Sequence, residues 1–226
     1  MGIVYKNDND EIVSKEEYES ELAKFQINVD AQYNIIVNEL LKEINNNAHS
    51  DKEKLWMLYD YLTSENMSYD LTVHPTDTRS ATPQRYSFRN YKKLTIAQDS
   101  KYPAILNNSG VCITYSLAFE DLANRLSIPC RVVKGYTGMD HAWNVVLIDN
   151  EVKQIDVAYA IMNRKISDKK DFFLKDSFNG RTITSSISDL ERDMRKQQYL
   201  REHPQIVINS RTDDGEEEPR ITIHKK

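Results

Sequence analysis

The chain has 226 residues, of which 39% are hydrophobic and 29% charged, and its formal net charge is −5. A chain of this length can bury the core of one ordinary domain and still carry extensions at its ends. The acidic balance and the lack of a basic stripe argue against nucleic acid as the main partner. No apolar run approaches the roughly 20 residues of a membrane span. The composition therefore favours a globular protein.

The start of the chain and the two cysteines bear on the compartment. Residues 1–12 lack the apolar segment of a signal peptide, so we expect an intracellular protein, or an exported one whose signal has been removed. Cys130 follows Pro129 at the start of an apolar segment, and we interpret it as a small buried residue. The cysteines and histidines do not have the spacing of metal ligands, so no metal site is expected.

Three helices are predicted before residue 65. Two of them begin with a capping box, in which a serine caps the first turn and a glutamate three residues later reaches back to the cap. These boxes are Ser14 with Glu17 and Ser50 with Glu53. The first helix is expected to end near residue 25. A second should span residues 30–44, where apolar residues recur at helical spacing.

Residues 71–109 form the least regular part of the sequence. They are rich in Thr, Ser, Pro and Tyr, with basic residues between them, and the segment is longer than an ordinary connection. Two interpretations stay open. The segment is either an irregular crossing of the surface or a loop on the substrate side, because it leads directly to Cys112.

Cys112 is predicted to open a helix. Over residues 113–126 the apolar side chains recur with a period close to 3.6, and Pro129 cannot continue the helix. The unpaired N–H groups and the dipole at a helix start lower the pKa of a cysteine. Cys112 is therefore a candidate nucleophile, and its own backbone N–H is a candidate donor to an oxyanion.

A β-hairpin is predicted after this helix. Its strands span residues 142–148 and 151–157, after an earlier strand at 131–136. Asp149 and Asn150 form the turn, since both tolerate the positive φ angles of a two-residue loop. Trp143 then pairs with Asp156, and His141 becomes a diagonal neighbour of Asp156 on the same face. A turn one residue longer would place them on opposite faces.

The C-terminal part is predicted to contain short elements of both kinds. These are a short helix or turn at 168–174, a helix at 188–201, and strands at 205–209 and 220–224. Ser188 and Glu191 match a third capping box. The two strands either pair with each other or dock on the main sheet. The acidic run at 213–218 between them is interpreted as a solvated loop.

Cys112, His141 and Asp156 form a candidate catalytic constellation. A histidine beside a thiol lowers the thiol pKa and carries a proton to a leaving group. A carboxylate beside that histidine fixes its tautomer and stabilises its charged form. The indole of Trp143 has no acid–base function, so we expect it to pack beside the pair and limit access of water.

Several segments together resemble the transglutaminase-like superfamily, whose members have a papain-like cysteine-enzyme fold. They are residues 66–70, 110–112, 131–135, 141–144 and 155–156, and the resemblance covers roughly residues 55–159. It implies an α+β fold in which N-terminal helices and a Cys-bearing helix pack on an antiparallel sheet. The implied division is an N-terminal helical extension at 1–49, a catalytic core at 50–174, and a C-terminal helix with a charged β-type extension at 175–226.

The resemblance also implies roles for individual residues. Cys112 is the implied nucleophile, His141 the general acid/base and Asp156 the third member, with Trp143 and Gly110 supporting the site. A second oxyanion donor comes from upstream of the cysteine in the family. Gln98 and Tyr102 are the candidates here.

The reaction stays open at this stage. The family contains acyl-transferring crosslinkers, proteases, deamidases, amide-cleaving deglycosylating enzymes and inactive members. We expect an enzyme that acts on amide bonds of proteins or peptides through a thioester, without a metal or organic cofactor. One alternative is a silent module that binds a protein or peptide. A third interpretation treats the three residues as ordinary core residues of an unrelated α+β protein. Oligomeric state is not predicted.

Overall fold

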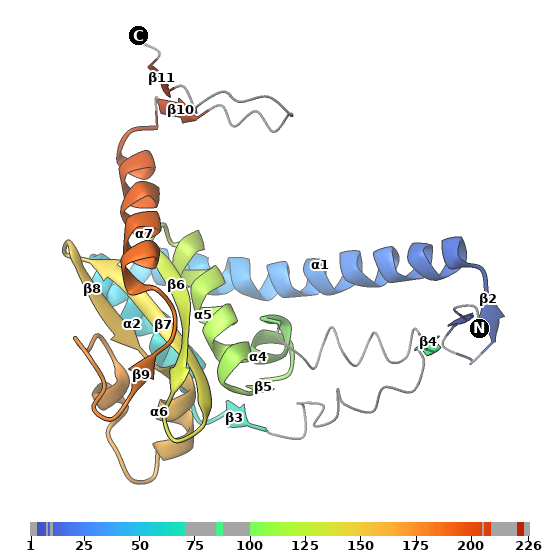
Figure 1. Cartoon of the computed structure of the whole chain (residues 1–226), viewed down its shortest axis with the longest axis horizontal. Helices are drawn as coiled ribbons and strands as arrows, with labels where there is room; N and C mark the ends of the chain where they lie inside the picture. Colours follow the sequence, from blue (N-terminus) through green and yellow to red (C-terminus); the bar gives the residue numbers. More distant parts are fainter. Residues whose placement is uncertain are drawn as a thin grey trace.

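A computed structural model describes residues 4–7, 9, 11–70, 85–87, 100–204, 206–208 and 221–223. An antiparallel sheet of four strands, ordered β8-β7-β6-β9, lies in the body of the molecule (Figure 1). Its strands are β6 (Cys130–Tyr136), β7 (Asp140–Ile148), β8 (Glu151–Ile155) and β9 (Thr182–Ile183). The α+β fold and the antiparallel sheet expected from the sequence are confirmed.

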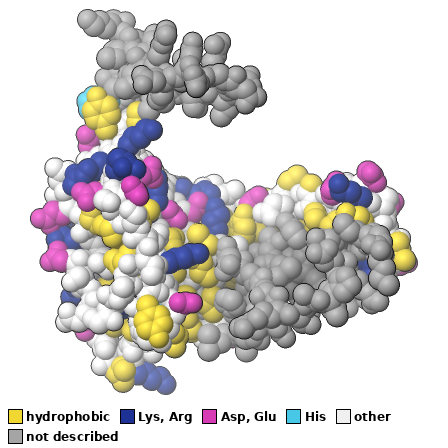
Figure 2. Space-filling view, in the orientation of Figure 1, with side chains coloured by type: hydrophobic (Ala, Val, Ile, Leu, Met, Phe, Trp, Pro, Cys, Tyr) yellow, Lys and Arg dark blue, Asp and Glu magenta, His cyan; other side chains and the backbone are white. Residues whose placement is uncertain are grey.

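Helices surround this sheet, and one of them reaches well beyond it. The helices are α1 (Lys15–Asn47), α2 (Asp51–Leu62), α4 (Tyr102–Leu106), α5 (Cys112–Arg125), α6 (Val157–Asn163), the 3₁₀ helix η2 (Lys169–Phe172) and α7 (Ile187–Glu202). Figure 1 shows α1 projecting from the body, with its C-terminal end beside α5. On the face shown in Figure 2, basic and acidic side chains are interspersed over the body.

The central strand β7 is buried on both faces. Val146 and Ile148 belong to the larger apolar core, which they share with α1, α2, α5 and α6. Val145 and Leu147 point the other way, into a smaller core closed by Met194 of α7. A strand covered on both faces is nearly continuously apolar, as β7 is, because water reaches neither face. The buried sheet therefore gives a rigid support to the residues at its ends.

Short strand pairs lie outside the main sheet. In one small sheet β1 (Val4–Lys6) pairs with β2 (Ile12–Val13) and β4 (Arg85–Ser87); in two others β3 (Ser68–Tyr69) pairs with β5 (Ser109–Gly110), and β10 (Ile206–Ile208) with β11 (Ile221–Ile223). The two C-terminal strands thus pair with each other, antiparallel, which decides between the alternatives left by the sequence.

The N-terminal helices differ from the prediction at one point. The expected helices ending near residue 25 and spanning 30–44 are one continuous helix, α1. No glycine or proline stands between Phe25 and Asp30 to end a helix, and Val29 is buried, so the helix continues through the gap in the apolar pattern. The predicted capping box is present. The backbone nitrogen of Glu17 lies 3.1 Å from Oγ of Ser14, and the backbone nitrogen of Ser14 lies 3.0 Å from Oε2 of Glu17.

Two further capping predictions need correction. Ser50 accepts the N–H of Glu53 at 3.2 Å, but the Glu53 carboxylate returns to the N–H of His49 rather than to that of Ser50. Ser186, not Ser188, caps α7. Ser186 stands two positions before Ser188, and Ile187 between them packs against the smaller core, so the helix begins two residues earlier than the motif suggested.

The hairpin has the predicted register, but its second strand ends two residues earlier than predicted. Asp149 and Asn150 have φ angles of 49° and 65°, and pairing runs outward from the turn to Asn144 with Ile155. The predicted strand 151–157 ends at Ile155, because the side chain of Asp156 caps α6 by accepting the N–H of Tyr159 at 2.9 Å.

Candidate active site

Cys112 is the first residue of α5, as the sequence predicted. The cap residue Val111 supplies no side-chain acceptor, so the first turn of this helix is not capped by its own side chain. Gly110 lies in β5 immediately before it. A side chain there would place its Cβ 2.6 Å from Cγ2 of Thr114, so only glycine lets β5 run this close to the start of α5. The half-buried thiol is thereby held at a helix N-terminus.

The surroundings of the thiol favour its charged form. Burial raises the pKa of the Cys112 thiol, but hydrogen bonds from the His141 imidazole and the Ala142 backbone N–H oppose it. The Tyr69 hydroxyl lowers the pKa further. The net pKa lies below the ordinary value for a cysteine, so the thiolate forms more readily than in a free side chain.

His141 and Asp156 are in direct contact. Nε2 of His141 lies 2.8 Å from Oδ2 of Asp156, and both side chains are buried. Since Nε2 is engaged by Asp156, the hydrogen bond to Cys112 falls to Nδ1. Burial lowers the pKa of His141, but hydrogen bonds to Asp156 and Cys112 outweigh burial and raise the pKa to about 9. The contact predicted from the hairpin register is therefore present, and it favours an imidazolium beside a thiolate.

Trp143 packs against His141 of this pair. Its ring stacks on His141 with centroids 5.7 Å apart and 23° between the planes, and its Nε1 donates to Gln154 at 2.9 Å. Tyr159 also contacts the imidazole, edge-on, with ring centroids 5.0 Å apart. The indole also needs Gly135 on β6, where an added Cβ would lie 2.5 Å from it. The position of Trp143 agrees with the packing role expected from the sequence.

Two residues beside the triad were not singled out as site residues by the sequence analysis. Arg181 donates to Oδ2 of Asp156, and its guanidinium lies over the rings of Trp143, Tyr159 and Phe178. It stands in an irregular segment 25 residues after Asp156, and no periodicity points to it.

Tyr69 is the second of these residues. Its hydroxyl exchanges hydrogen bonds with the backbone N–H and side chain of Cys112, and burial followed by the charge of Cys112 raises the Tyr69 pKa to about 12. The pairing of β3 with β5, in which Tyr69 lies opposite Gly110, brings it there. Tyr69 belongs to residues 66–70, one of the segments that resemble the superfamily, and this was the one feature of the sequence that pointed to it.

The two residues proposed from the sequence as oxyanion donors fare differently. The hydroxyl of Tyr102 donates to Asp30 and accepts from Nε2 of Gln26 at 3.0 Å, both on α1. Tyr102 therefore fastens α4 to α1, and the structure does not bring its hydroxyl to Cys112. Gln98 lies outside the described residues.

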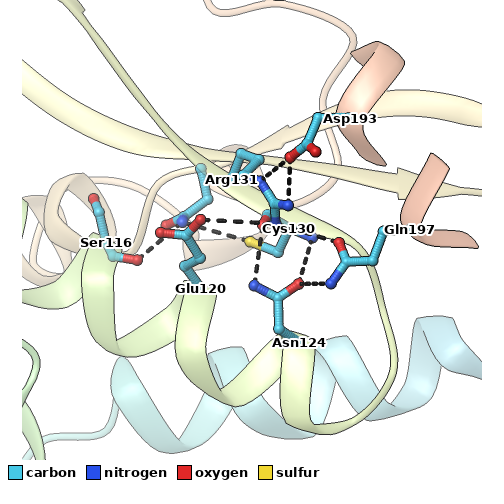
Figure 3. Close-up of polar contacts among 8 residues, drawn as sticks. Ser116, Glu120, Asn124, Cys130, Arg131, Asp193 and Gln197 are labelled. Carbon is cyan, nitrogen blue, oxygen red and sulfur yellow. Dashed lines mark hydrogen bonds and ion pairs between the residues drawn. The ribbon is translucent and has the colours of Figure 1, made fainter. Parts of the chain in front are cut away.

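The second cysteine, Cys130, is buried in a cluster of side chains that connects α5, α7 and the sheet. Cys130 is fully buried, and burial raises its thiol pKa well above the ordinary value. Its backbone N–H donates to Asn124 at 3.1 Å, and the neighbouring Arg131 donates to Asp193 at 2.7 Å (Figure 3). Gln197 joins the same cluster, which ties α7 to α5 and the sheet. Both cysteines are free, so no disulfide removes the candidate nucleophile.

The residues that the structure describes offer neither a cluster for a metal ion nor a membrane-spanning helix. Within that part of the chain, no group of three or more His, Cys, Asp or Glu side chains could hold a metal ion. Nor does that part contain a helix with the length and apolar character needed to cross a membrane.

The family of the protein follows from comparison with known sequences. Residues 38–152, half of the chain, match the family described as the transglutaminase-like superfamily. The chain therefore belongs to this superfamily, as its motifs indicated, and it has the fold of a cysteine enzyme. No curated protein matches the sequence.

Solved structures give more distant similarities. One is a crystal structure of a TGase, with a TM-score of 0.44 and 16% identity over 80% of this chain and 44% of that one. Another is a candidate cysteine protease from Cytophaga hutchinsonii, with a TM-score of 0.34 and 18% identity over 66% of this chain and 49% of that one. The chain thus spans less than half the length of either.

Proposed function

We propose that the protein is a cysteine-dependent enzyme that acts on amide bonds of proteins or peptides through a thioester acyl-enzyme. The observation that carries the proposal is the placement of His141, whose Nε2 lies 2.8 Å from Asp156 while the same ring hydrogen-bonds Cys112. The lowered thiol pKa and the raised imidazole pKa both favour the thiolate–imidazolium pair that such chemistry uses.

The first half-reaction uses each of these groups. The Cys112 thiolate attacks the carbonyl carbon of the amide, and the carbonyl electrons move to oxygen. The imidazolium of His141 gives its Nδ1 proton to the departing nitrogen as the carbon–nitrogen bond breaks, which leaves a thioester on Cys112. Asp156 keeps the ring oriented and stabilises its charge before the transfer.

The second half-reaction releases the acyl group. Water or an amine gives a proton to His141 and attacks the thioester carbon, and Cys112 leaves as a thiolate. Water as the acceptor gives hydrolysis or deamidation, and an amine gives transfer to a new amide. The two outcomes share every residue named above and differ only in the acceptor that attacks the thioester.

The oxyanion of the first step has two candidate donors. One is the backbone N–H of Cys112 at the start of α5. The other is the hydroxyl of Tyr69, which accepts that N–H at rest and donates to the sulfur. When a carbonyl oxygen takes the N–H, the tyrosine proton is free to turn to the oxyanion. Tyr69 thus joins Gln98 as a candidate for the second donor, while the hydroxyl of Tyr102 is engaged by α1.

The hydrogen bond between the Tyr69 hydroxyl and the backbone N–H of Cys112 favours a second candidate function. Because the Tyr69 hydroxyl occupies the N–H of Cys112, a substrate carbonyl has to displace it. A protein in which this displacement does not occur would bind a protein or peptide partner without turning it over.

Thiol labelling separates the two candidates. With iodoacetamide near pH 7, Cys112 should alkylate much faster than free cysteine, because its lowered pKa increases the thiolate fraction. The native protein contains its own control, since buried Cys130 should stay unlabelled. Labelling of Cys112 no faster than free cysteine would count against the enzyme.

The reaction type requires a second experiment. The protein is incubated with a proteome digest, with and without an added primary amine, and products are identified by mass. A Cys112→Ala variant processed in parallel defines the background. Amine adducts indicate transfer, a gain of about one mass unit at glutamine or asparagine indicates deamidation, and new chain ends indicate proteolysis. A product pattern identical to that of Cys112→Ala would contradict the proposal.

A further inference from the structure

Arg181 lies where the cysteine chemistry does not obviously require an arginine. Its side chain is only 7% exposed, and it donates to the oxygen of Asp156 that also receives His141. A guanidinium is charged at every accessible pH, so burying it is costly unless a counter-charge is present. Here the counter-charge is Asp156, the residue that orients the imidazole.

The segment that carries Arg181 is fastened to the sheet on both sides. Before it, Lys175 pairs with Gln154, with N–H to oxygen distances of 2.7 and 3.0 Å. After it, Thr182 and Ile183 pair with β6 as strand β9. The backbone between these anchors carries Arg181, whose buried side chain reaches Asp156. Its position is therefore set by the sheet, not by the ion pair alone.

Aromatic rings fix the guanidinium in one place. Its central carbon lies 4.0 Å from the ring centre of Phe178, 4.3 Å from that of Tyr159 and 5.3 Å from that of Trp143. Cations are attracted to such ring faces, the more so when water is excluded. Tyr159 and Trp143 are also the two rings that hold His141. The arginine and the imidazole therefore share the same two aromatic neighbours and the same carboxylate oxygen.

We infer that Arg181 is a positioning residue of the site, which shares the Asp156 carboxylate with His141 and thereby limits how strongly the imidazole holds its proton. The inference rests on the proposed function, because a proton on His141 matters only if it is passed on. Without Arg181, the imidazolium would be the main counter-charge of a buried carboxylate and would release its proton less readily. A general acid works best when its proton is not held too tightly at the working pH.

Other charged or titratable groups also face the pair. Cys112 approaches His141 from α5, Tyr159 from α6, and Tyr69 approaches Cys112 from β3. Of these, Cys112 acts on His141 most directly, because its hydrogen bond and its charge both raise the His141 pKa. A test of Arg181 should therefore remove the thiol first.

The experiment measures the titration of His141 by NMR in protein with ¹³C-labelled histidine. Cys112→Ala is the reference, and Arg181→Gln or Arg181→Lys is added to it. Arg181→Gln should raise the pKa of His141 by about one unit, as expected for loss of a unit charge a few ångströms away in a half-polar site. Arg181→Lys keeps the charge and should change the pKa by much less.

Arg195→Gln is the matched control. This arginine binds Asn150 and Glu191 on the surface, so its loss should leave the His141 titration unchanged. If Arg181→Gln does not fold, Phe178→Ala removes one wall of the aromatic cage and keeps the charge, and a smaller upward shift is expected. An unchanged His141 pKa in the folded variant overturns the inference, because a purely structural arginine would change only stability.

The labelling experiment separates failure of the inference from failure of the proposed function. Reactive Cys112 in native protein together with an unshifted His141 in Arg181→Gln would refute the role of Arg181 alone. Unreactive Cys112 together with a shifted His141 would refute the enzyme, while the electrostatic coupling of Arg181 to His141 would be supported.

Discussion

The two cysteines of this protein lie in opposite electrostatic environments, although both are at least partly buried. Cys112 begins a helix, and its pKa is lowered because hydrogen bonds from His141 and from a backbone N–H outweigh burial. Cys130 begins a strand, and its pKa is raised because burial is opposed only weakly, mainly by Asn144, whose Nδ2 lies 3.6 Å from the sulfur.

The difference shows that suitable neighbours can outweigh the burial of a thiol at Cys112, whereas at Cys130 burial prevails. An amide donor such as Asn144 can stabilise a thiolate only slightly, whereas an imidazolium supplies a full positive charge. The polar residues around Cys130 connect elements of the fold. Arg131 pairs with Asp193 of α7, and Asn124 of α5 binds the backbone of Cys130 (Figure 3). The contrast can be tested by removing one neighbour at a time.

The largest effect is expected from Asp156→Asn. The amide keeps the shape of the carboxylate but cannot hold the imidazolium, so turnover should fall by up to ~10⁴-fold, as in comparable serine triads. The rate is measured on an amide substrate found in the proteome experiment. Asp168→Asn is a matched control, because Asp168 also caps a helix, the 3₁₀ helix η2, by accepting the N–H of Lys170 at 2.9 Å, and it has no contact with His141. Equal losses in the two variants would mean that Asp156 acts only as a cap.

Tyr69→Phe should have the next largest effect. It removes one proposed oxyanion donor, and loss of such a donor costs about 10²–10³-fold in turnover. The rate of acyl-enzyme formation is the measurement. Tyr102→Phe distinguishes the two tyrosines, because its hydroxyl binds α1 and its loss should leave that rate close to wild type. Greater sensitivity at Tyr102 than at Tyr69 would restore the donor suggested by the sequence.

How far the sequence predicted this site depended on how local each signal was. The Asp149–Asn150 turn fixed the hairpin register, and with it the contact of His141 with Asp156. Apolar periodicity and Pro129 likewise predicted helix α5 and its start. Both predictions used residues near one another in the chain, where spacing determines which side chains can meet.

Residues brought in from distant segments were not predictable in this way. Arg181 reaches Asp156 because its segment is held by pairing at Lys175 and at β9, two contacts with no short-range signature. Tyr69 reaches Cys112 through a two-residue parallel pairing, 43 positions earlier in the chain. Tyr102, by contrast, lies only ten residues before Cys112 in the chain, but its ring packs on Tyr33 of α1.

Trp143→Phe should have a smaller effect than the two changes above. A phenyl ring can still stack beside His141, so the fall in turnover should stay within about tenfold, whereas His141→Ala should remove most activity. Loss of the indole N–H leaves Gln154 without its donor in a buried place, which costs about 1–3 kcal/mol of stability. Turnover and the free energy of unfolding are both measured. Loss of activity as large as in His141→Ala would assign Trp143 a direct part in the chemistry.

Cys130→Ala should have the smallest effect on function. Removing the sulfur leaves a void the size of one atom in the larger core, which costs about 1 kcal/mol. Asn144 loses the weaker of its two Nδ2 contacts, the one to the sulfur at 3.6 Å, and keeps its hydrogen bond to the backbone oxygen of Ser116 at 3.0 Å.

The labelling rate of Cys112 in this variant should equal that of the native protein, and the free energy of unfolding by denaturant should fall slightly. The two cysteines would then be independent, one chemical and one structural. A change in the Cys112 labelling rate would show that they are coupled. The coupling path would run through Ser116, whose backbone oxygen binds Asn144 and whose hydroxyl donates to the carbonyl of Cys112 at 2.8 Å. In that case Ser116→Ala should abolish the coupling, because it removes the link to the first turn of α5 while leaving its backbone oxygen in place.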